Sequence, residues 1–194
     1  MAEQESGFRP RLFTGFALSP EVRAYVAAVA ARLSATVPGV RWVPPENLHV
    51  TLKFIGQCED DRVPRLVQAM RQASEALPIR LEIGGVGGFP SQSSARVIWV
   101  GADDGTGRVK KVYEVLDKGA EKCGFPREKR AYRPHITIGR ARKKPVALPP
   151  GIDEEPGRLT LAVNEIVLFH SELKSTGAEY SVVERTGPGK VSDT

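Results

Sequence analysis

Two of the three histidines in this chain of 194 residues stand in the same short pattern, in which an apolar residue, a threonine and a second apolar residue follow the histidine. One copy runs from His49 to Leu52 and the other from His135 to Ile138. Because side chains alternate between the two faces of a β-strand, the histidine and threonine of each copy would share one face and the apolar residues the other. Each strand would then present an imidazole beside a hydroxyl group.

Two such strands facing each other would suit phosphoryl chemistry without a metal ion. One neutral imidazole could take a proton from water, while a second, protonated imidazole gives a proton to the leaving oxygen. The two threonine hydroxyls could donate hydrogen bonds to the phosphate oxygens as negative charge builds up on them. The sequence therefore predicts four catalytic residues: His49, His135, Thr51 and Thr137.

Two other interpretations of these histidines stay open at this point. A histidine on a half-buried strand can be an ordinary polar residue with satisfied hydrogen bonds. A zinc site would need a third ligand, and His170 is the only other histidine; no His-x-x-x-His or Cys-x-x-Cys spacing accompanies it. The paired occurrence favours catalysis, and we expect neither a metal site nor a cofactor.

The elements that must position these residues repeat along the chain. A strand expected over 11–18 precedes a helix that begins at Pro20 after Ser19, and a strand over 96–100 precedes a helix over 106–123. The starts of these strands are 96 − 11 = 85 residues apart, and the two histidines are 135 − 49 = 86 apart. We predict an α+β, duplicated, bilobal fold of two mainly antiparallel sheets, with helices outside and a central cleft.

The remaining pattern predicts a helix over 61–77 and strands over 40–43, 48–55, 79–83, 135–139, 159–163, 166–169 and 180–184. The glycine-rich run 84–88 is expected to form a bend between strands, and 143–157 a loop. We expect flexible tails over 1–10 and 187–194, around a single two-lobed domain over 11–186.

Composition limits the class of protein. Apolar residues make up 41% and charged residues 26%, and the net charge is +5, values that exclude a disordered or fibrous chain. The longest apolar run, Ala24–Ala31, is too short for a membrane span, and no secretory signal is visible. The two cysteines, Cys58 and Cys123, do not make a disulfide framework. We expect a cytoplasmic monomer that does not act at a membrane.

The segments around the two patterns resemble a known superfamily. Arg41–Gly56 resembles the first signature of the two-histidine phosphoesterases, and Tyr132–Arg140 resembles the second. The flanking runs Gly88–Gly101 and Ser171–Tyr180 are similar to the branch of bacterial and archaeal RNA 2′,3′-cyclic phosphodiesterases, historically called 2′-5′ RNA ligases. The resemblance implies a bilobal α+β fold in which both signatures line a central cleft.

The same resemblance implies a reaction. It is the metal-independent opening of a 2′,3′-cyclic phosphate to a 2′-phosphate end, with Arg140 holding the phosphate. The partners would be RNA with such ends or small cyclic nucleotides. We favour His135 as the base and His49 as the acid, although the repeat makes the two nearly equivalent. Two rival functions are a phosphodiesterase for another small cyclic phosphate and an RNA-binding module without turnover.

Further residues near the patterns are candidates for substrate binding. Lys53 shares the strand alternation of His49 and Thr51, which predicts it at the rim of the phosphate site, with a solvated lysine as the alternative. Tyr132, Trp42 and Phe54 could stack on a base or pack in the core. Positions 127–144 hold eight basic residues and one acidic residue, which favours an RNA backbone track or an exposed basic loop.

Overall fold

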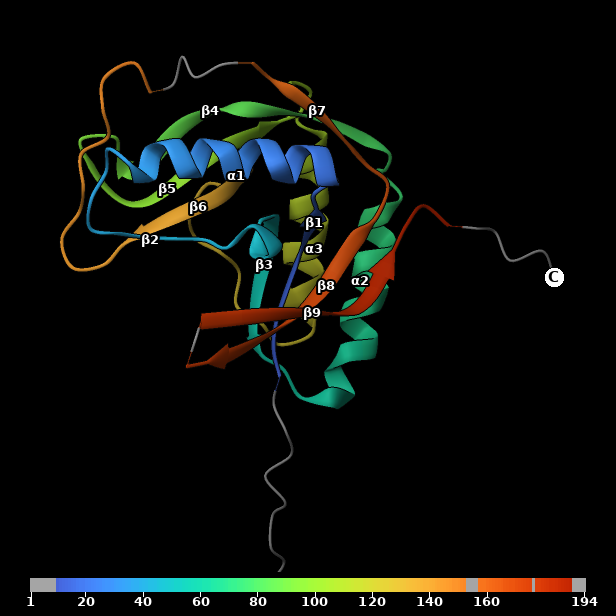
Figure 1. Ribbon diagram of the computed structural model, residues 1–194. Coiled ribbons are helices and arrows are strands. Elements are labelled where there is room, and N and C mark those ends of the chain that lie inside the picture. The colour runs from blue at the N-terminus through green and yellow to red at the C-terminus, as the bar shows by residue number, and fades with distance from the viewer. Residues whose placement is uncertain (1–9, 153–156, 176, 190–194) are drawn as a thin grey trace, which may run out of the picture.

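The structure is a computed structural model that describes residues 10–152, 157–175 and 177–189 (Figure 1). Most of the tails predicted over 1–10 and 187–194 lies outside these residues. The predicted extent of the single domain, 11–186, stays a prediction. Within the described residues no helix is long and apolar enough to cross a membrane.

The helices and strands confirm the predicted elements, with ends that differ by a few residues in most cases. The α-helices are α1 (Pro20–Ser34), α2 (Val63–Ser74) and α3 (Arg108–Lys122), and the short 3-10 helices are η1 (Pro45–Asn47) and η2 (Asp60–Arg62). The strands are β1 (Arg11–Ala17), β2 (Val40–Trp42), β3 (His49–Gln57), β4 (Ile79–Ser91), β5 (Ser94–Asp103), β6 (His135–Ala141), β7 (Leu159–Val163), β8 (Ile166–Lys174) and β9 (Gly177–Thr186).

The start of α1 shows how local sequence sets an element. The Ser19 side chain accepts a hydrogen bond from the backbone nitrogen of Val22, and Pro20 occupies the first helical position, where no backbone N–H is needed. Apolar residues recur at helical spacing behind this cap, so that one stripe of α1 is buried.

All nine strands belong to one antiparallel sheet, in the order β7-β4-β5-β6-β3-β1-β8-β9, with β2 paired to the end of β6. The sheet curls into a half-barrel (Figure 1). The prediction of two sheets is therefore wrong, because a single residue pair, Val50 of β3 with Ile136 of β6, joins the two halves. Strand β2 occupies the same edge of β6 farther along, so β3 pairs only at its beginning.

The strand order is symmetric about this joint. Outwards from it, β3, β1, β8 and β9 on one side match β6, β5, β4 and β7 on the other. The register agrees, since Phe16 of β1 pairs with Val50 and Val100 of β5 pairs with Ile136. The duplication that the sequence predicted is therefore a two-fold relation between the halves of one sheet.

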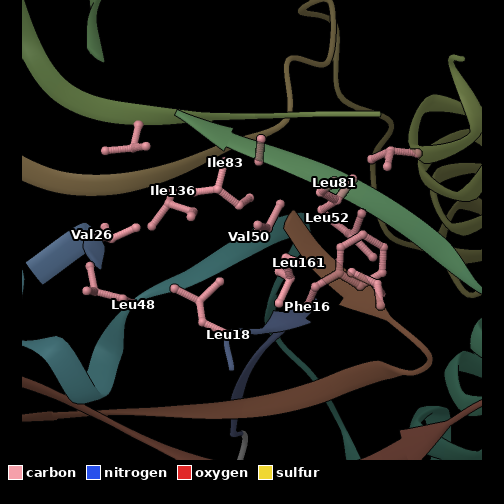
Figure 2. Close-up of a cluster of buried hydrophobic side chains, with 14 of the residues drawn as sticks. Phe16, Leu18, Val26, Leu48, Val50, Leu52, Leu81, Ile83, Ile136 and Leu161 are labelled. Carbon is pink, nitrogen blue, oxygen red and sulfur yellow. The ribbon is translucent and has the colours of Figure 1, made fainter. Parts of the chain in front are cut away.

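The helices and the core link these halves. Helix α1 follows β1 in the chain but packs against β2, β6 and β7, while α3 follows β5 but packs against β3 and α2. A continuous apolar core joins the halves, and Figure 2 shows Phe16, Val50, Leu81 and Ile136 within it. Each half thus covers part of the other.

The glycine-rich run over 84–88 is part of a strand, which corrects the prediction of a bend. Strand β4 continues through it, paired with β5. A Cβ atom at Gly87 would lie only 2.2 Å from the ring of Trp99, so the strand needs a residue without a side chain there. Gly85, at φ 68°, is an extra residue that interrupts the register with β5.

Candidate active site

The four predicted catalytic residues lie beside the single pair that joins the two halves of the sheet. Val50 and Ile136 form this pair and are fully buried. Their neighbours on both strands are half-buried and point to the opposite face, which we call the site face. These neighbours are His49, Thr51, His135 and Thr137.

Each imidazole contacts the backbone carbonyl oxygen of the residue two positions before it. Nδ1 of His49 lies 2.7 Å from the carbonyl oxygen of Asn47, and Nδ1 of His135 lies 2.7 Å from that of Arg133. Since a carbonyl oxygen only accepts, both Nδ1 atoms carry a proton, and Nε2 of each neutral ring keeps a lone pair. The Thr51 hydroxyl lies 2.9 Å from Nε2 of His49, and with this tautomer it donates.

Aromatic side chains pack around the His49 ring. The ring centroids of Phe13 and Phe169 lie 4.6 Å and 5.9 Å from that of His49, and the Tyr180 ring meets it edge-on at 5.4 Å. These neighbours exclude water from one side of the imidazole. They were not among the residues predicted from the sequence.

The His135 ring has a matching aromatic neighbour. Phe89 meets it edge-on at 5.1 Å, and Trp99 lies at 6.3 Å. In the symmetric strand order Phe89 of β4 occupies the position of Phe169 in β8. Phe89 pairs with Val97 of β5, and Phe169 pairs with Phe13, the equivalent residue of β1. A comparison of the two repeats, strand by strand, would have revealed this pair.

The surroundings of the imidazoles keep them neutral. The pKa of His49 is lowered from 6.5 to about 4, mainly by burial and in smaller part by the positive charges of His135 and Arg140, while the hydrogen bond to the Asn47 carbonyl raises it. Burial and the charge of Arg140 also lower the pKa of His135, while its hydrogen bond to the Arg133 carbonyl raises it. Arg140 thus acts on both imidazoles, and an anion bound among them would favour their protonated forms.

Matched bulges decide which residues follow the histidines on the site face. Strand β3 has an extra residue, Leu52, relative to β1, and β6 has an extra residue, Ile138, at the equivalent place relative to β5. A second extra residue of β3, Ile55, lies farther along. A bulge reverses the alternation, so the fifth residue after each histidine returns to the site face. These residues are Phe54, which is 67% exposed and 6.0 Å from the Phe13 ring, and Arg140.

The predicted role of Lys53 at the phosphate rim is wrong. The bulge turns Lys53 to the other face, where it is 5% exposed. Its Nζ lies 2.7 Å from Oδ1 of Asp117 in α3 and 3.0 Å from the carbonyl oxygen of Pro126. Arg127 pairs with the other oxygen of this carboxylate. Lys53 is therefore part of a buried ion pair between β3 and α3.

Tyr132 also has an internal role rather than the predicted contact with substrate. Its ring stacks on Tyr113 with centroids 4.3 Å apart, and its hydroxyl donates to the carbonyl oxygen of Thr51 at 3.0 Å. Burial raises the pKa of Tyr132. Tyr132 thus ties the segment before β6 to β3. Trp42 packs against the core, which was the alternative to base stacking.

The structure gives no support to a zinc site. Among the described residues no group of three or more histidine, cysteine, aspartate and glutamate side chains could hold a metal ion. His170 follows Phe169 on β8 and lies with Val63 and Pro64 beside α2. It is therefore on the face opposite the two motif histidines and cannot be their third ligand.

Comparison with known families decides what this arrangement is. The family model described as "LigT like Phosphoesterase" matches residues 16–99 and again residues 100–180. The chain belongs to the LigT-like phosphoesterase family. The two consecutive matches also confirm the duplication predicted from the sequence.

Two relatives of this chain carry the same name. The RNA 2′,3′-cyclic phosphodiesterase of Archaeoglobus fulgidus is 35% identical over 134 residues, which cover 69% of this chain and 74% of that protein. The protein of the same name from Thermus thermophilus is 31% identical over an alignment that covers 90% of this chain and 88% of that protein. The crystal structure of E. coli LigT complexed with 3′-AMP has a TM-score of 0.78 and 25% identity, and covers 93% of this chain and 98% of that chain.

Proposed function

We propose that this LigT-like phosphoesterase hydrolyses the 2′,3′-cyclic phosphate ends of RNA to 2′-phosphates without a metal ion. The observation that carries the proposal is the gathering of two histidine–threonine pairs on one face, with the charge of Arg140 acting on both imidazoles. The shared name of the relatives supports RNA as the substrate class. The expectations of a cytoplasmic monomer and of two lobes around a central cleft stay predictions.

In this reaction water attacks the phosphorus and the bond from phosphorus to the 3′ oxygen breaks. Nε2 of His135 accepts the proton of the attacking water, and protonated Nε2 of His49 gives a proton to the 3′ oxygen. The hydroxyls of Thr51 and Thr137 donate to the non-bridging oxygens, and Arg140 balances the charge that develops on them. The 2′ oxygen keeps the phosphate.

The two sides of the site differ in the residue that returns to the site face after each histidine. Phe54 follows His49 on the site face, and Arg140 takes the equivalent place after His135. An exposed phenyl ring suits a nucleobase, whereas a guanidinium suits phosphate oxygens. A nucleobase over Phe54 would leave the phosphate on the side of Arg140.

The test is product analysis on a short RNA with a 2′,3′-cyclic phosphate end, in excess chelator. We expect conversion to the 2′-phosphate. Binding without ring opening would make the protein an RNA-binding module, and activity that disappears with chelator and returns with zinc or manganese would overturn the metal-independent mechanism. Turnover confined to other cyclic phosphates would make it a phosphodiesterase of a different substrate class.

A further inference from the structure

Strand β2 brings a second arginine next to Arg140. In the pairing of β2 with β6, Arg41 lies directly opposite Arg140. Both side chains are exposed, whereas Val40 and Trp42 face the position of Gly139, where an added Cβ would meet both. Since neighbours on a strand point to opposite faces, the two arginines share the site face.

Two arginines in such a pair repel each other unless an anion lies between or beside them. Directly opposite residues have Cβ atoms about 4.5–5.5 Å apart, and like charges there are unfavourable. Within the described part of the chain no carboxylate forms an ion pair with Arg41 or Arg140. The guanidinium group is well suited to phosphate because it offers several donors in a fixed plane. The pair therefore provides two adjacent positions for phosphate groups.

The residue equivalent to Arg41 in the other half has a different role. With the 86-residue offset of the histidines, 135 − 49, the counterpart of Arg41 is Arg127, since 41 + 86 = 127. Arg127 precedes β6 outside any strand, and its Nε donates to the buried carboxylate of Asp117. The arginine pair is therefore not repeated at this equivalent position, which gives the site a direction.

Resting on the proposed function, we propose that Arg41 binds the phosphodiester that joins the terminal nucleotide to the rest of the RNA, while Arg140 binds the cyclic phosphate. The two phosphates belong to one nucleotide, and the two arginines lie on neighbouring strands, so each arginine can face one of the phosphates. Arg41 lies on the outer side of β6 relative to β5, and only Arg140 of the pair acts on both imidazoles. Arg41 is therefore a residue that favours RNA ends over free cyclic nucleotides.

The experiment compares adenosine 2′,3′-cyclic phosphate with a diadenosine dinucleotide that carries the same cyclic end. We expect Arg41→Ala to lower the ratio of kcat/KM for the dinucleotide to kcat/KM for the mononucleotide about tenfold, mostly through KM, which is the scale of one lost charged hydrogen bond. Arg41→Lys should restore part of the ratio. The control is Arg71→Ala, which removes an exposed arginine from α2 and should leave the ratio unchanged.

A change in the substrate tests the same contact from the other side. An uncharged methylphosphonate can replace the internal linkage of the dinucleotide. With this substrate the kcat/KM of the unsubstituted protein should fall by the same factor as the Arg41→Ala substitution causes on the charged dinucleotide. The Arg41→Ala variant should not distinguish the two linkages. Its kcat/KM for the charged dinucleotide should also depend less on salt, by about one unit of slope in the log–log plot.

Other outcomes would overturn the assignment. An equal loss on mononucleotide and dinucleotide would place Arg41 at the reacting phosphate or in a structural role, and no loss on either would make it a solvated surface residue. Thermal melting of Arg41→Ala and Arg41→Gln shows whether folding is intact. If the natural protein opens neither substrate, the proposed function fails and this inference fails with it, whereas activity without a change of ratio overturns the inference alone.

Discussion

The carbonyl oxygens of Asn47 and Arg133 determine how the two imidazoles can react. Each holds a proton on Nδ1, so Nε2 is the atom left to exchange protons. The same bond persists when the ring is charged, because Nδ1 donates in both protonation states. Each histidine can therefore gain or lose the Nε2 proton without turning in its site.

The first prediction concerns removal of either imidazole. His49→Ala and His135→Ala should each lower kcat at least about 100-fold, which is the usual scale for a lost acid or base. Single-turnover kinetics with a 2′,3′-cyclic nucleotide measure this loss. His170→Ala is the matched control and should keep most activity, since His170 lies beside α2 on the other face. Near-normal turnover of either motif variant would remove that histidine from the mechanism.

The second prediction concerns pH. In the free protein the pKa of His49 is about 4 and that of His135 is below its usual value, while the negative charge of a bound cyclic phosphate raises both. Because kcat/KM reports the free protein and kcat the complex, the optimum of kcat should lie at higher pH than that of kcat/KM. Rates measured from about pH 4 to pH 9 test this. Coinciding optima would contradict the proposed effect of the substrate's charge.

The residues of the site differ in how far the sequence could predict them. The histidine–threonine pairs follow from strand alternation and duplication, both local or repeated patterns. The position of Lys53 does not, because the bulge at Leu52 depends on pairing with β1, which is distant in the chain. Arg140, by contrast, was assigned by resemblance to a family whose signature already includes the effect of such a bulge.

At the scale of the elements, the segment before β6 is fastened to β3 outside the sheet. Lys53 bonds the carbonyl of Pro126, Asp117 accepts from the backbone nitrogen of Glu128 at 3.2 Å, and Tyr132 donates to Thr51. Since one backbone pair alone joins β3 to β6, these bonds help the apolar core to fix how the two motif strands lie relative to each other.

The third prediction concerns the buried ion pair. Lys53→Met leaves the carboxylate of Asp117 buried without its closest cation and should lower the free energy of unfolding by about 3–5 kcal/mol. Lys110→Met is the control, because the exposed pair of Lys110 with Glu114 in α3 contributes about 0.5 kcal/mol or less. Urea denaturation measures both changes. Similar small losses in the two variants would show that the buried pair does not stabilise this contact.

The fourth prediction concerns the Tyr132 hydroxyl. Tyr132→Phe keeps the ring on Tyr113 but removes the bond to Thr51, so kcat should fall roughly 3–10-fold through misplacement of the strands, with little change in KM. Steady-state kinetics separate the two constants. Tyr113→Phe is the control, and its rates should stay normal. A change confined to KM would instead return Tyr132 to the role of a substrate contact.

The glycine-rich strand shows what element prediction lacks. Glycines over 84–88 predict a bend from local chemistry, yet they lie in β4 because Trp99 of the neighbouring strand occupies the space above Gly87. That reason is a contact between strands, and it is not visible in the run itself. The predicted helices agree better with the structure because helix caps and the spacing of apolar residues are local features of the sequence.

For the whole molecule, the exchange of helices between halves predicts a single folding unit. The fifth prediction is that urea unfolding followed by circular dichroism and by tryptophan fluorescence gives coincident transitions. Trp42 and Trp99 both lie in the half that contains β6, whereas circular dichroism reports all elements. A fluorescence transition separated from the dichroism transition would show that the halves unfold independently.

The prediction of two sheets was wrong for a reason at the same scale. Each repeat has its own strands and helix, which suggests a separate sheet for each, but the pair of Val50 with Ile136 closes the gap between them. One pair of residues in a chain of this length leaves no signal in a single sequence. The duplication itself was predictable because the same pattern of residues occurs twice along the chain.

The two-fold relation between the halves has a consequence for regioselectivity. A site whose halves were identical would offer the same groups to both sides of the cyclic phosphate and would leave the choice between the 2′ and 3′ bonds to the asymmetry of the nucleotide. The protein's own contribution to this selection resides in the positions where the repeats differ. They include Phe13, which lies 4.6 Å from the His49 ring and corresponds to Val97, and Phe54, which corresponds to Arg140. A change in the proportion of the two product isomers on substitution at these positions would measure how much the departure from internal symmetry contributes to the choice.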